Sequence, residues 1–292
     1  MNSLRPHSNA VSSRLRPLLA LVAILALLGG AGCARKPWGE PVTTDRYGPI
    51  METIREMQQS DAARSDCIDS DVDIFFTSSV RNRAANGYLQ LLQPKYLKVI
   101  IFNPLDQPLL AFVSDGTTCQ LINTVDAFAS AGPLASFATT YAIPPLASAS
   151  DWGIWLTGRL PRTLNITAIR EDEKNRGIWL SLADQPPVVT GDHNAAPVRE
   201  HLLIDTRQKR ILERILASSG DSFKAHILYQ NPQSEPPQDL GRQPEKITID
   251  GLDYNGKLEI HFNDIQTIES CQPSDFRLKI PPGYQYQPLS AD

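Results

Sequence analysis

The side chain whose surroundings point most clearly to chemistry is the thiol of Cys33. A short basic segment opens the chain, the apolar run Pro17–Leu28 follows, and small residues lead up to the cysteine. This order is typical of a bacterial lipoprotein signal, in which the mature chain begins with a cysteine that carries acyl chains. The run is also shorter than the ~20 residues that span a bilayer. We therefore predict a signal peptide over residues 1–32 and lipidation of Cys33, with an ordinary secretory signal and an incidental cysteine as the alternative.

The residues after Cys33 predict where the protein is held. Ala34 takes the position at which an aspartate commonly retains a lipoprotein in the inner membrane, so we expect attachment to the periplasmic face of the outer membrane. Residues 33–48 are polar and contain prolines, which predicts a flexible, lipid-anchored tether. The stretch Pro49–Ala63 has apolar residues at helical spacing and predicts an amphipathic helix packed on the domain. A helix lying on the membrane surface is the alternative.

Beyond Cys33 the chain has three further cysteines, Cys67, Cys119 and Cys271. A disulfide is plausible outside the cytoplasm, and an odd number leaves one thiol free or paired elsewhere. We favour a bond between Cys67 and Cys271, because the ends of a chain often meet when a sheet curls. The spacing contains no CxxC pair, so we expect no metal site here.

The remaining residues that could do chemistry do not form a catalytic pattern. The five histidines show neither metal-ligand spacing nor an HExxH motif. His201 and His261 fall in predicted strands, where surface or core-edge positions are the simpler interpretation. The chain has no GxSxG elbow, no P-loop and no GxGxxG after a strand. Carboxylates such as Asp71 and Asp73 alternate on one strand face, as solvated residues do. We predict that the protein is not an enzyme and uses no cofactor or metal.

Charge and hydropathy exclude further classes of protein. The net charge is −4, and no basic stripe runs along the sequence, so nucleic acid is not an expected partner. After residue 32 no apolar run is long enough to cross a bilayer.

Short apolar runs, separated by turns that contain Pro or Asp-Gly, should form the strands that position the candidate residues. Four such runs follow one another: Gly87–Leu92, Tyr96–Asn103, Leu109–Ser114 and Thr118–Asn123. The breaks between them are too short for a helix, so consecutive strands should be antiparallel neighbours. Similar runs before and after this meander bring the expected total to about eleven strands in one domain over residues 49–292. Val125–Ala149 is expected to be a connector that could contain short helical turns, and Phe276–Ile280 is expected to be the closing strand.

One short helix is expected among these strands. Ser150 can cap it, Gly158 can end it, and Trp152 and Trp155 give it a large apolar face. It could be a lid over the sheet or a plain core helix.

Several motifs in this order resemble those of the lipoprotein-localisation carriers and receptors, the LolA/LolB-like family. They are Gly87-Tyr88-Leu89, Gln93-Pro94-Lys95-Tyr96-Leu97-Lys98, Asn103-Pro104-Leu105, Val113-Ser114-Asp115-Gly116 and the ending Phe276–Tyr284. The resemblance implies a mainly β fold, a half-open antiparallel β-barrel with a short helical lid. It implies an apolar cavity for lipid acyl chains or lipoproteins, and a periplasmic carrier protein as a possible partner. The lipid anchor makes the chain similar to the outer-membrane receptor rather than the soluble carrier.

The resemblance also points to particular side chains. Alternate residues of a strand face the same side of the sheet, so large apolar strand residues could line this cavity or simply fill the core, together with the two tryptophans of the short helix: Leu89, Leu91, Val99, Ile101, Leu110, Phe112, Trp152 and Trp155. Leu105, in a predicted exposed turn, is similar to a residue with which the family's receptor delivers cargo to the membrane. Arg81 and Arg83 are candidates for the arginine that holds the lid in the carriers.

Three functions compete at this stage. The first is a receptor that binds lipid chains or lipoproteins and acts in their trafficking to the outer membrane. The second is a structural or assembly lipoprotein that uses the same barrel as a protein-docking module. The third is a secreted enzyme, which the lack of a catalytic constellation disfavours. Whether the interior of the barrel is hollow or filled separates the first two.

Overall fold

The structure is a computed structural model that describes residues 36–141, 152–183, 198–218, 223–231, 243–251, 256–268 and 271–290. The predicted signal peptide and Cys33 lie outside these residues, as do residues 142–151 of the predicted connector and the start of the short helix. Trp38–Asp292 forms one compact unit by its internal contacts.

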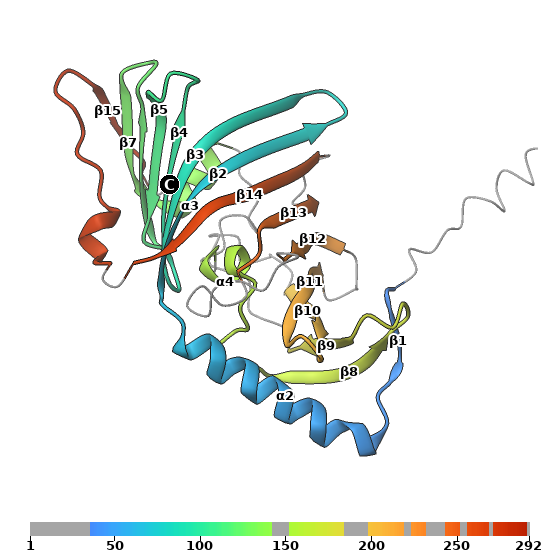
Figure 1. The fold of residues 1–292 in the computed structure, drawn as a ribbon. Helices are drawn as coiled ribbons and strands as arrows, with labels where there is room; N and C mark the ends of the chain where they lie inside the picture. Colours follow the sequence, from blue (N-terminus) through green and yellow to red (C-terminus); the bar gives the residue numbers. More distant parts are fainter. Residues whose placement is uncertain are drawn as a thin grey trace, which may run out of the picture. The chain divides into compact units, whose positions relative to one another are not determined.

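A single sheet of fifteen strands organises the described residues (Figure 1). In the order in which they lie across the sheet, the strands are β1 (Trp38–Pro41), β8 (Ile166–Asp172), β9 (Ile178–Leu182), β10 (Val198–Asp205), β11 (Arg210–Ser218), β12 (Phe223–Gln230), β13 (Lys246–Gly251), β14 (Gly256–Thr267), β2 (Cys67–Ser78), β3 (Asn82–Leu92), β4 (Tyr96–Phe102), β5 (Pro108–Ser114), β6 (Thr118–Asn123), β7 (Phe128–Pro133) and β15 (Gln285–Pro288). The strand pairs are antiparallel except β15, which pairs with β7 in parallel.

The structure corrects the predicted half-open barrel of about eleven strands. The sheet is open, with β1 and β15 as its two edges, and it has fifteen strands. Three of these, β1, β7 and β15, were not predicted, because they are short and lack the alternating large apolar residues that mark a strand. The predicted closing strand Phe276–Ile280 was wrong. A 3-10 helix occupies Pro273–Phe276, and β15 follows farther along the chain.

The central meander forms as its turn chemistry predicts. Strands β3 to β6 cover the four predicted runs, and each pairs with the next. At the turn between β5 and β6, Asp115 accepts hydrogen bonds from the backbone of Thr117 and Thr118, at 2.8 and 2.7 Å. Gly116 there has φ of 84°, a conformation that favours glycine. This turn fixes the register between β5 and β6, two strands that contribute residues to the candidate site.

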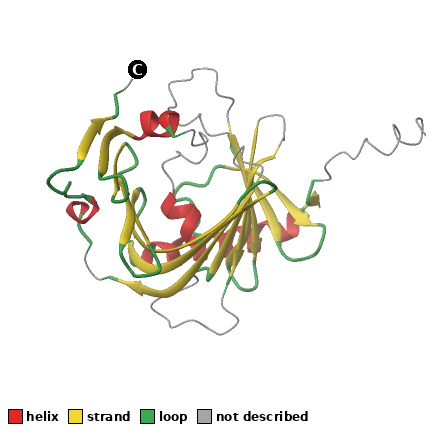
Figure 2. Cartoon of the chain, turned by 90° about the horizontal axis from the view of Figure 1, so that it is seen from above, coloured by secondary structure: helices red, strands yellow, loops and turns green. Residues whose placement is uncertain are grey.

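Three α-helices accompany the sheet within the described residues, α2 (Thr44–Ala63), α3 (Leu134–Thr140) and α4 (Trp152–Thr157). The buried face of α2 consists of Ile50, Ile54 and Met57, which join one core cluster with Trp155 and residues of most strands. The sheet curves around the helices in Figure 2.

The N-terminal part of this unit is more ordered than predicted. The helix starts at Thr44 rather than at Pro49, which lies within it. The preceding strand β1 pairs with β8. Trp38 is buried there and stacks on His201, with ring centroids 4.3 Å apart. The predicted tether over residues 33–48 is therefore part of the packed structure from Trp38 onward.

The C-terminal segment crosses the meander and joins its far edge. Cys67 and Cys271, the predicted pair, form a disulfide with Cα atoms 5.8 Å apart. Phe276 then packs on Tyr96, with ring centroids 5.5 Å apart, before β15 pairs with β7. Cys119 is free and buried, and burial raises the pKa of its thiol to about 12. The segment holds the strands that form the wall of the candidate site.

Candidate functional site, an apolar cavity

A cavity of about 440 Å³ lies between strands β4 to β7 and helices α3 and α4. Its wall is almost entirely apolar. The sheet contributes Leu97, Val99, Leu110, Phe112, Ser114, Leu121, Asn123 and Phe128, and the helical side contributes Leu134, Phe137, Ala138, Tyr141 and Trp152. This size and lining are typical of pockets that bind small apolar ligands.

The sheet wall follows directly from strand register. Val99 lies opposite Phe112, and Phe112 lies opposite Leu121. Residues directly opposite one another in antiparallel strands share a face, so these three side chains form one row. A second row two residues along contains Leu110, which lies opposite Asn123. Because the pairing sets these rows, a one-residue slip would turn the whole wall away from the cavity.

The helical wall is held against the sheet by aromatic contacts. Phe137 of α3 lies 5.0 Å from Phe112 and 4.6 Å from Tyr141, between ring centroids. Leu134, Phe137 and Ala138 are buried, whereas Tyr141 is 42% exposed at the end of the helix. The exposed Tyr141 places one border of the cavity at the protein surface.

The polar residues in the wall are occupied in local turns. Ser114 donates a hydrogen bond to the Thr118 carbonyl at 3.1 Å, and its Oγ accepts one from the Gly116 amide at 3.0 Å. The Asn123 side chain bonds to Asp126 at 2.7 Å and to the Val125 amide at 3.0 Å. Neither side chain is charged, and both are satisfied outside the cavity. The cavity therefore suits an uncharged hydrocarbon better than a polar ligand.

The predicted cavity residues fall into two groups. Val99, Leu110, Phe112 and Trp152 line the cavity. Leu89, Leu91 and Trp155 pack in the main core instead, at 2%, 1% and 6% exposure. Ile101 lies opposite Leu110 on the same sheet face but is not part of the lining.

Sequence reasoning allowed short helical turns in Val125–Ala149 but did not assign them to the wall of a cavity. Phe128, Leu134, Phe137 and Tyr141 lie in the stretch that was interpreted as a connector because of its small and hydroxyl residues. The apolar residues Leu134, Phe137 and Tyr141 have i, i+3, i+7 spacing, which is the signal of a helix face that could have found them.

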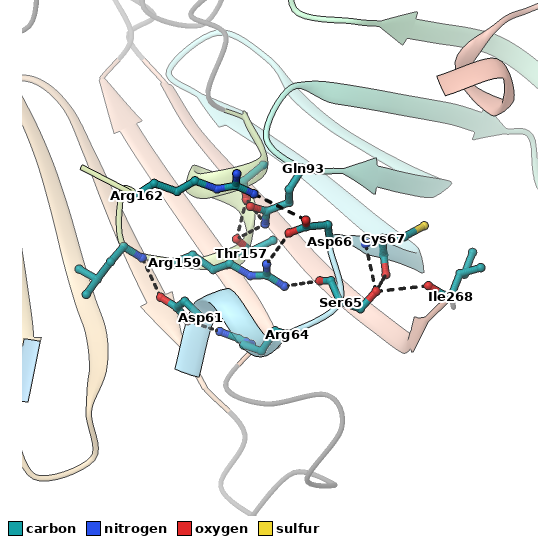
Figure 3. Close-up of polar contacts among 12 residues, drawn as sticks. Asp61, Arg64, Ser65, Asp66, Cys67, Gln93, Thr157, Arg159, Arg162 and Ile268 are labelled. Carbon is teal, nitrogen blue, oxygen red and sulfur yellow. Dashed lines mark hydrogen bonds and ion pairs between the residues drawn. The ribbon is translucent and has the colours of Figure 1, made fainter. Parts of the chain in front are cut away.

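A polar cluster fastens α4, and with it Trp152, to the sheet (Figure 3). Gln93, at the end of β3, donates to the Gly153 carbonyl at 3.2 Å and to the Thr157 hydroxyl at 3.0 Å. Arg159, which is 4% exposed, donates to the Ser65 carbonyl at 2.6 Å. Burial first, and the charge of Arg64 second, lower the pKa of Arg159 to about 10. These contacts give the cavity a fixed rather than a loose helical border.

Leu105 is 77% exposed at the turn between β4 and β5. Asn103 organises this turn, because its side-chain oxygen accepts hydrogen bonds from the amides of Leu105 and Gln107, at 2.9 and 3.0 Å. The leucine therefore projects from an ordered turn. Arg81 and Arg83 are exposed, and in the described part of the chain neither guanidinium has a hydrogen bond or ion pair that would link it to α3 or α4.

The histidines that drew attention in the sequence have structural surroundings. His201 is 3% exposed, and its Nδ1 lies 2.9 Å from the Ser181 hydroxyl beneath Trp38. The ring of His261 lies 5.1 Å from that of Phe75, between centroids, and its Nε2 lies 3.5 Å from Glu259. Among the residues that the structure describes, no three His, Cys, Asp or Glu side chains are grouped to hold a metal ion. No helix in the same described ranges has the length and hydropathy needed to span a bilayer.

Comparisons with solved structures identify the fold. A domain described as an outer membrane lipoprotein-sorting protein, from Vibrio parahaemolyticus, has a TM-score of 0.53 and 12% identity, covering 78% of this chain and 97% of its own. A DUF1329 family protein from Desulfovibrio piger has a TM-score of 0.51 and 10% identity, covering 82% and 98%. A LolA superfamily protein from Nitrosomonas europaea has a TM-score of 0.47 and 13% identity, covering 79% and 97%. The chain therefore shares its fold with the lipoprotein-sorting domain and with the DUF1329 protein.

No family model matches the sequence, and no curated protein matches it. The likeness is therefore one of fold, carried by the architecture rather than by sequence identity.

Proposed function

We propose that the protein binds acyl chains of a lipid or lipoprotein in the cavity between β4–β7 and α3, and that it acts in lipoprotein or lipid trafficking in the cell envelope. The observation that carries this proposal is the cavity itself, with its volume of about 440 Å³ and its apolar lining. The fold shared with a lipoprotein-sorting domain supports it.

Hydrocarbon matches the cavity energetically. Each methylene moved from water into an apolar site contributes ~0.8 kcal/mol, so a chain of about six buried methylenes would contribute roughly 5 kcal/mol before the costs of binding. The wall supplies no charged side chain to repel or desolvate. A charged headgroup would remain outside the cavity, at the border marked by Tyr141.

The predicted lipid anchor and the exposed turns would act together at the membrane. Lipidation of Cys33 would hold the chain at the outer membrane. Leu105 would then contact the bilayer or a lipoprotein during transfer, and the neighbouring turns support this role. Val80 and Val125 are 84% and 71% exposed. In an antiparallel meander, every second turn lies at the same end of the strands. The β2–β3, β4–β5 and β6–β7 turns therefore place these three aliphatic side chains at one end of the strands.

The test uses full-length protein, purified in a non-ionic detergent and exchanged to a low detergent concentration. A fluorescent fatty acid is titrated in and displaced by palmitate. Val99→Phe places a larger side chain in the cavity and should weaken binding at least tenfold while preserving the fold. Ile100→Phe, on the opposite face of the same strand, is the matched control and should leave binding unchanged.

Two results would count against acyl-chain binding. If the wild-type protein takes up no fatty acid, the cavity is not a lipid site and the docking-module function is favoured. If Val99→Phe lowers stability by the ~1–3 kcal/mol typical of an overpacked core, the residue is in a filled interior rather than a cavity wall.

A further inference from the structure

A second, smaller cavity of about 220 Å³ lies in a different part of the fold. It is bordered by the C-terminal half of α2, the turn between β10 and β11, and the end of β12. Its polar lining includes Asp61, Arg64, Lys209, Arg210, Tyr229 and Asn231. None of these residues belongs to the apolar cavity.

The cavity collects buried hydrogen-bond donors that have no protein partner. Among the described residues, four such nitrogen atoms belong to its lining: Nε and Nη2 of Arg64, Nε of Arg210 and Nδ2 of Asn231. Most buried polar groups in proteins are hydrogen-bonded, so a cluster of buried donors at one cavity requires an explanation. The donors belong to three side chains from three different elements, so crowding of neighbouring residues within one element does not explain why they cluster.

The carboxylates in and beside this cavity are already engaged. Asp61 Oδ1 accepts from Arg64 Nη1 at 2.8 Å, and Asp61 Oδ2 accepts from the Leu160 amide at 3.0 Å. Lys209 forms an ion pair with Glu56 at 2.6 Å. Arg210 has no ion pair within the described residues. The described residues that line the cavity include three cations, Arg64, Lys209 and Arg210, and one carboxylate, Asp61, so positive charge is in excess in the lining.

The donors are also fixed in place. The Arg64 side chain is 11% exposed and is oriented by Asp61, which in turn is bonded to the chain after α4 (Figure 3). Arg210 and Asn231 lie at the start of β11 and just after β12, two strands that pair directly. A preformed set of donors costs little reorganisation when a ligand arrives.

We propose that this second cavity binds a small oxyanion, a phosphate or sulfate group, either free or as part of a small phosphate ester. Guanidinium groups present planar, permanently charged donors whose geometry matches phosphate oxygens. The excess positive charge favours an anion, and the volume is below the ~300 Å³ at which pockets for larger organic ligands begin. Because the bound anion would join α2 to β11 and β12, its binding should stabilise the fold.

The proposal is tested by thermal unfolding of the full-length protein in a non-ionic detergent, with sodium phosphate, sulfate or chloride at matched ionic strength. At ten times the dissociation constant, phosphate and sulfate should raise Tm by roughly 3–6 °C relative to chloride. Arg210→Gln should remove this increase. Arg207→Gln, which changes an exposed arginine in the same β10–β11 turn, should retain it.

Calorimetric titration of the wild-type protein with inorganic phosphate gives a readout that does not depend on a variant folding. One site per chain is expected, and its absence would overturn the proposal. Equal loss of the phosphate effect in Arg207→Gln and Arg210→Gln would overturn it as well, because the effect would then be general charge screening. Glycerol phosphate separates the sources: binding of both ligands assigns the site to ester headgroups, and binding of phosphate alone assigns it to the free anion.

Discussion

The rings of Phe112 and Phe137 lie 5.0 Å apart and join the two walls of the apolar cavity. Phe112 belongs to β5, in the middle of the sheet wall, and Phe137 to α3. Both residues also line the cavity. This contact therefore couples the shape of the cavity to the position of α3.

Removing one of the two rings should enlarge the cavity. Phe137 is 7% exposed, and replacing a buried phenylalanine by alanine typically costs about 3–5 kcal/mol. Because this ring already borders a cavity, we expect Phe137→Ala to cost about 2–3 kcal/mol, below that range. Urea denaturation measures the loss in the free energy of unfolding. Titration with fatty acids of different length should show that the variant prefers longer acyl chains than the wild type. Phe75→Ala, at a position 37% exposed, is the control. Unchanged chain-length preference would mean that α3 moves in to close the gap.

A second prediction concerns stability at low pH. Burial alone would raise the pKa of Asp172, but hydrogen bonds from Arg176 and Trp179 outweigh it and lower the pKa to about 2. Its side chain has 0% exposure. The folded-state pKa is below the unfolded value, so the stabilisation is complete above about pH 4 and is lost as the pH falls toward 2. Its size is about 2 kcal/mol.

Urea denaturation between pH 2 and pH 6 checks this prediction. The stability of the wild-type protein should fall in that window, and Asp172→Asn should be less stable at neutral pH with a shallower dependence below about pH 4. Asp71→Asn, an exposed position on β2, serves as the control and should follow the wild-type curve. Parallel curves for wild type and Asp172→Asn would show that other carboxylates dominate acid unfolding.

A third prediction concerns the disulfide. It closes a sequence separation of 204 residues and attaches the segment that crosses β4 and carries β15. Loss of a native disulfide commonly costs about 2–5 kcal/mol, so Cys67→Ala should fall in that range. The same change should make Cys119 reactive, because the thiol packs with Leu289 beyond β15. Alkylation followed by mass spectrometry measures the reactivity. A protected Cys119 in Cys67→Ala would mean that β15 stays paired without the disulfide.

The sequence predicted the parts of the fold where local signals and tertiary packing agree. Strands β3 to β6 have large apolar residues at alternate positions and turn residues between them, so their existence, order and shared face could be derived. The strands β7 and β15 at the edge of the same sheet could not be derived from the sequence. β7 reads FASAGP and β15 reads QYQP, and both become strands through pairing with a neighbour rather than through their own composition.

The same reasoning explains the partial prediction of the site. Val99, Leu110 and Phe112 were found because alternation assigns them to one face. Alternation cannot tell a residue that lines a cavity from one that packs in the core, and Leu89 and Leu91 share that face but belong to the main core cluster. The helical wall depends on α3, a helix of seven residues that only the i, i+3, i+7 spacing of Leu134, Phe137 and Tyr141 marks, while the small and hydroxyl residues around them favour a loop.

The last prediction concerns the exposed turns. Leu105 is 77% exposed, and the turn is held by Asn103 rather than by the leucine side chain, so Leu105→Asp should change stability by less than ~0.5 kcal/mol. If the side chain enters a bilayer or contacts a lipoprotein, the same change should slow transfer of bound fatty acid or lipoprotein to liposomes. Adding Val80→Asp and Val125→Asp should slow transfer further, because the three turns lie at the same end of the strands. Leu105→Met keeps an apolar tip and should transfer at the wild-type rate. If transfer by the triple variant equals that of the wild type while fatty-acid binding is retained, cargo must leave by another edge of the protein.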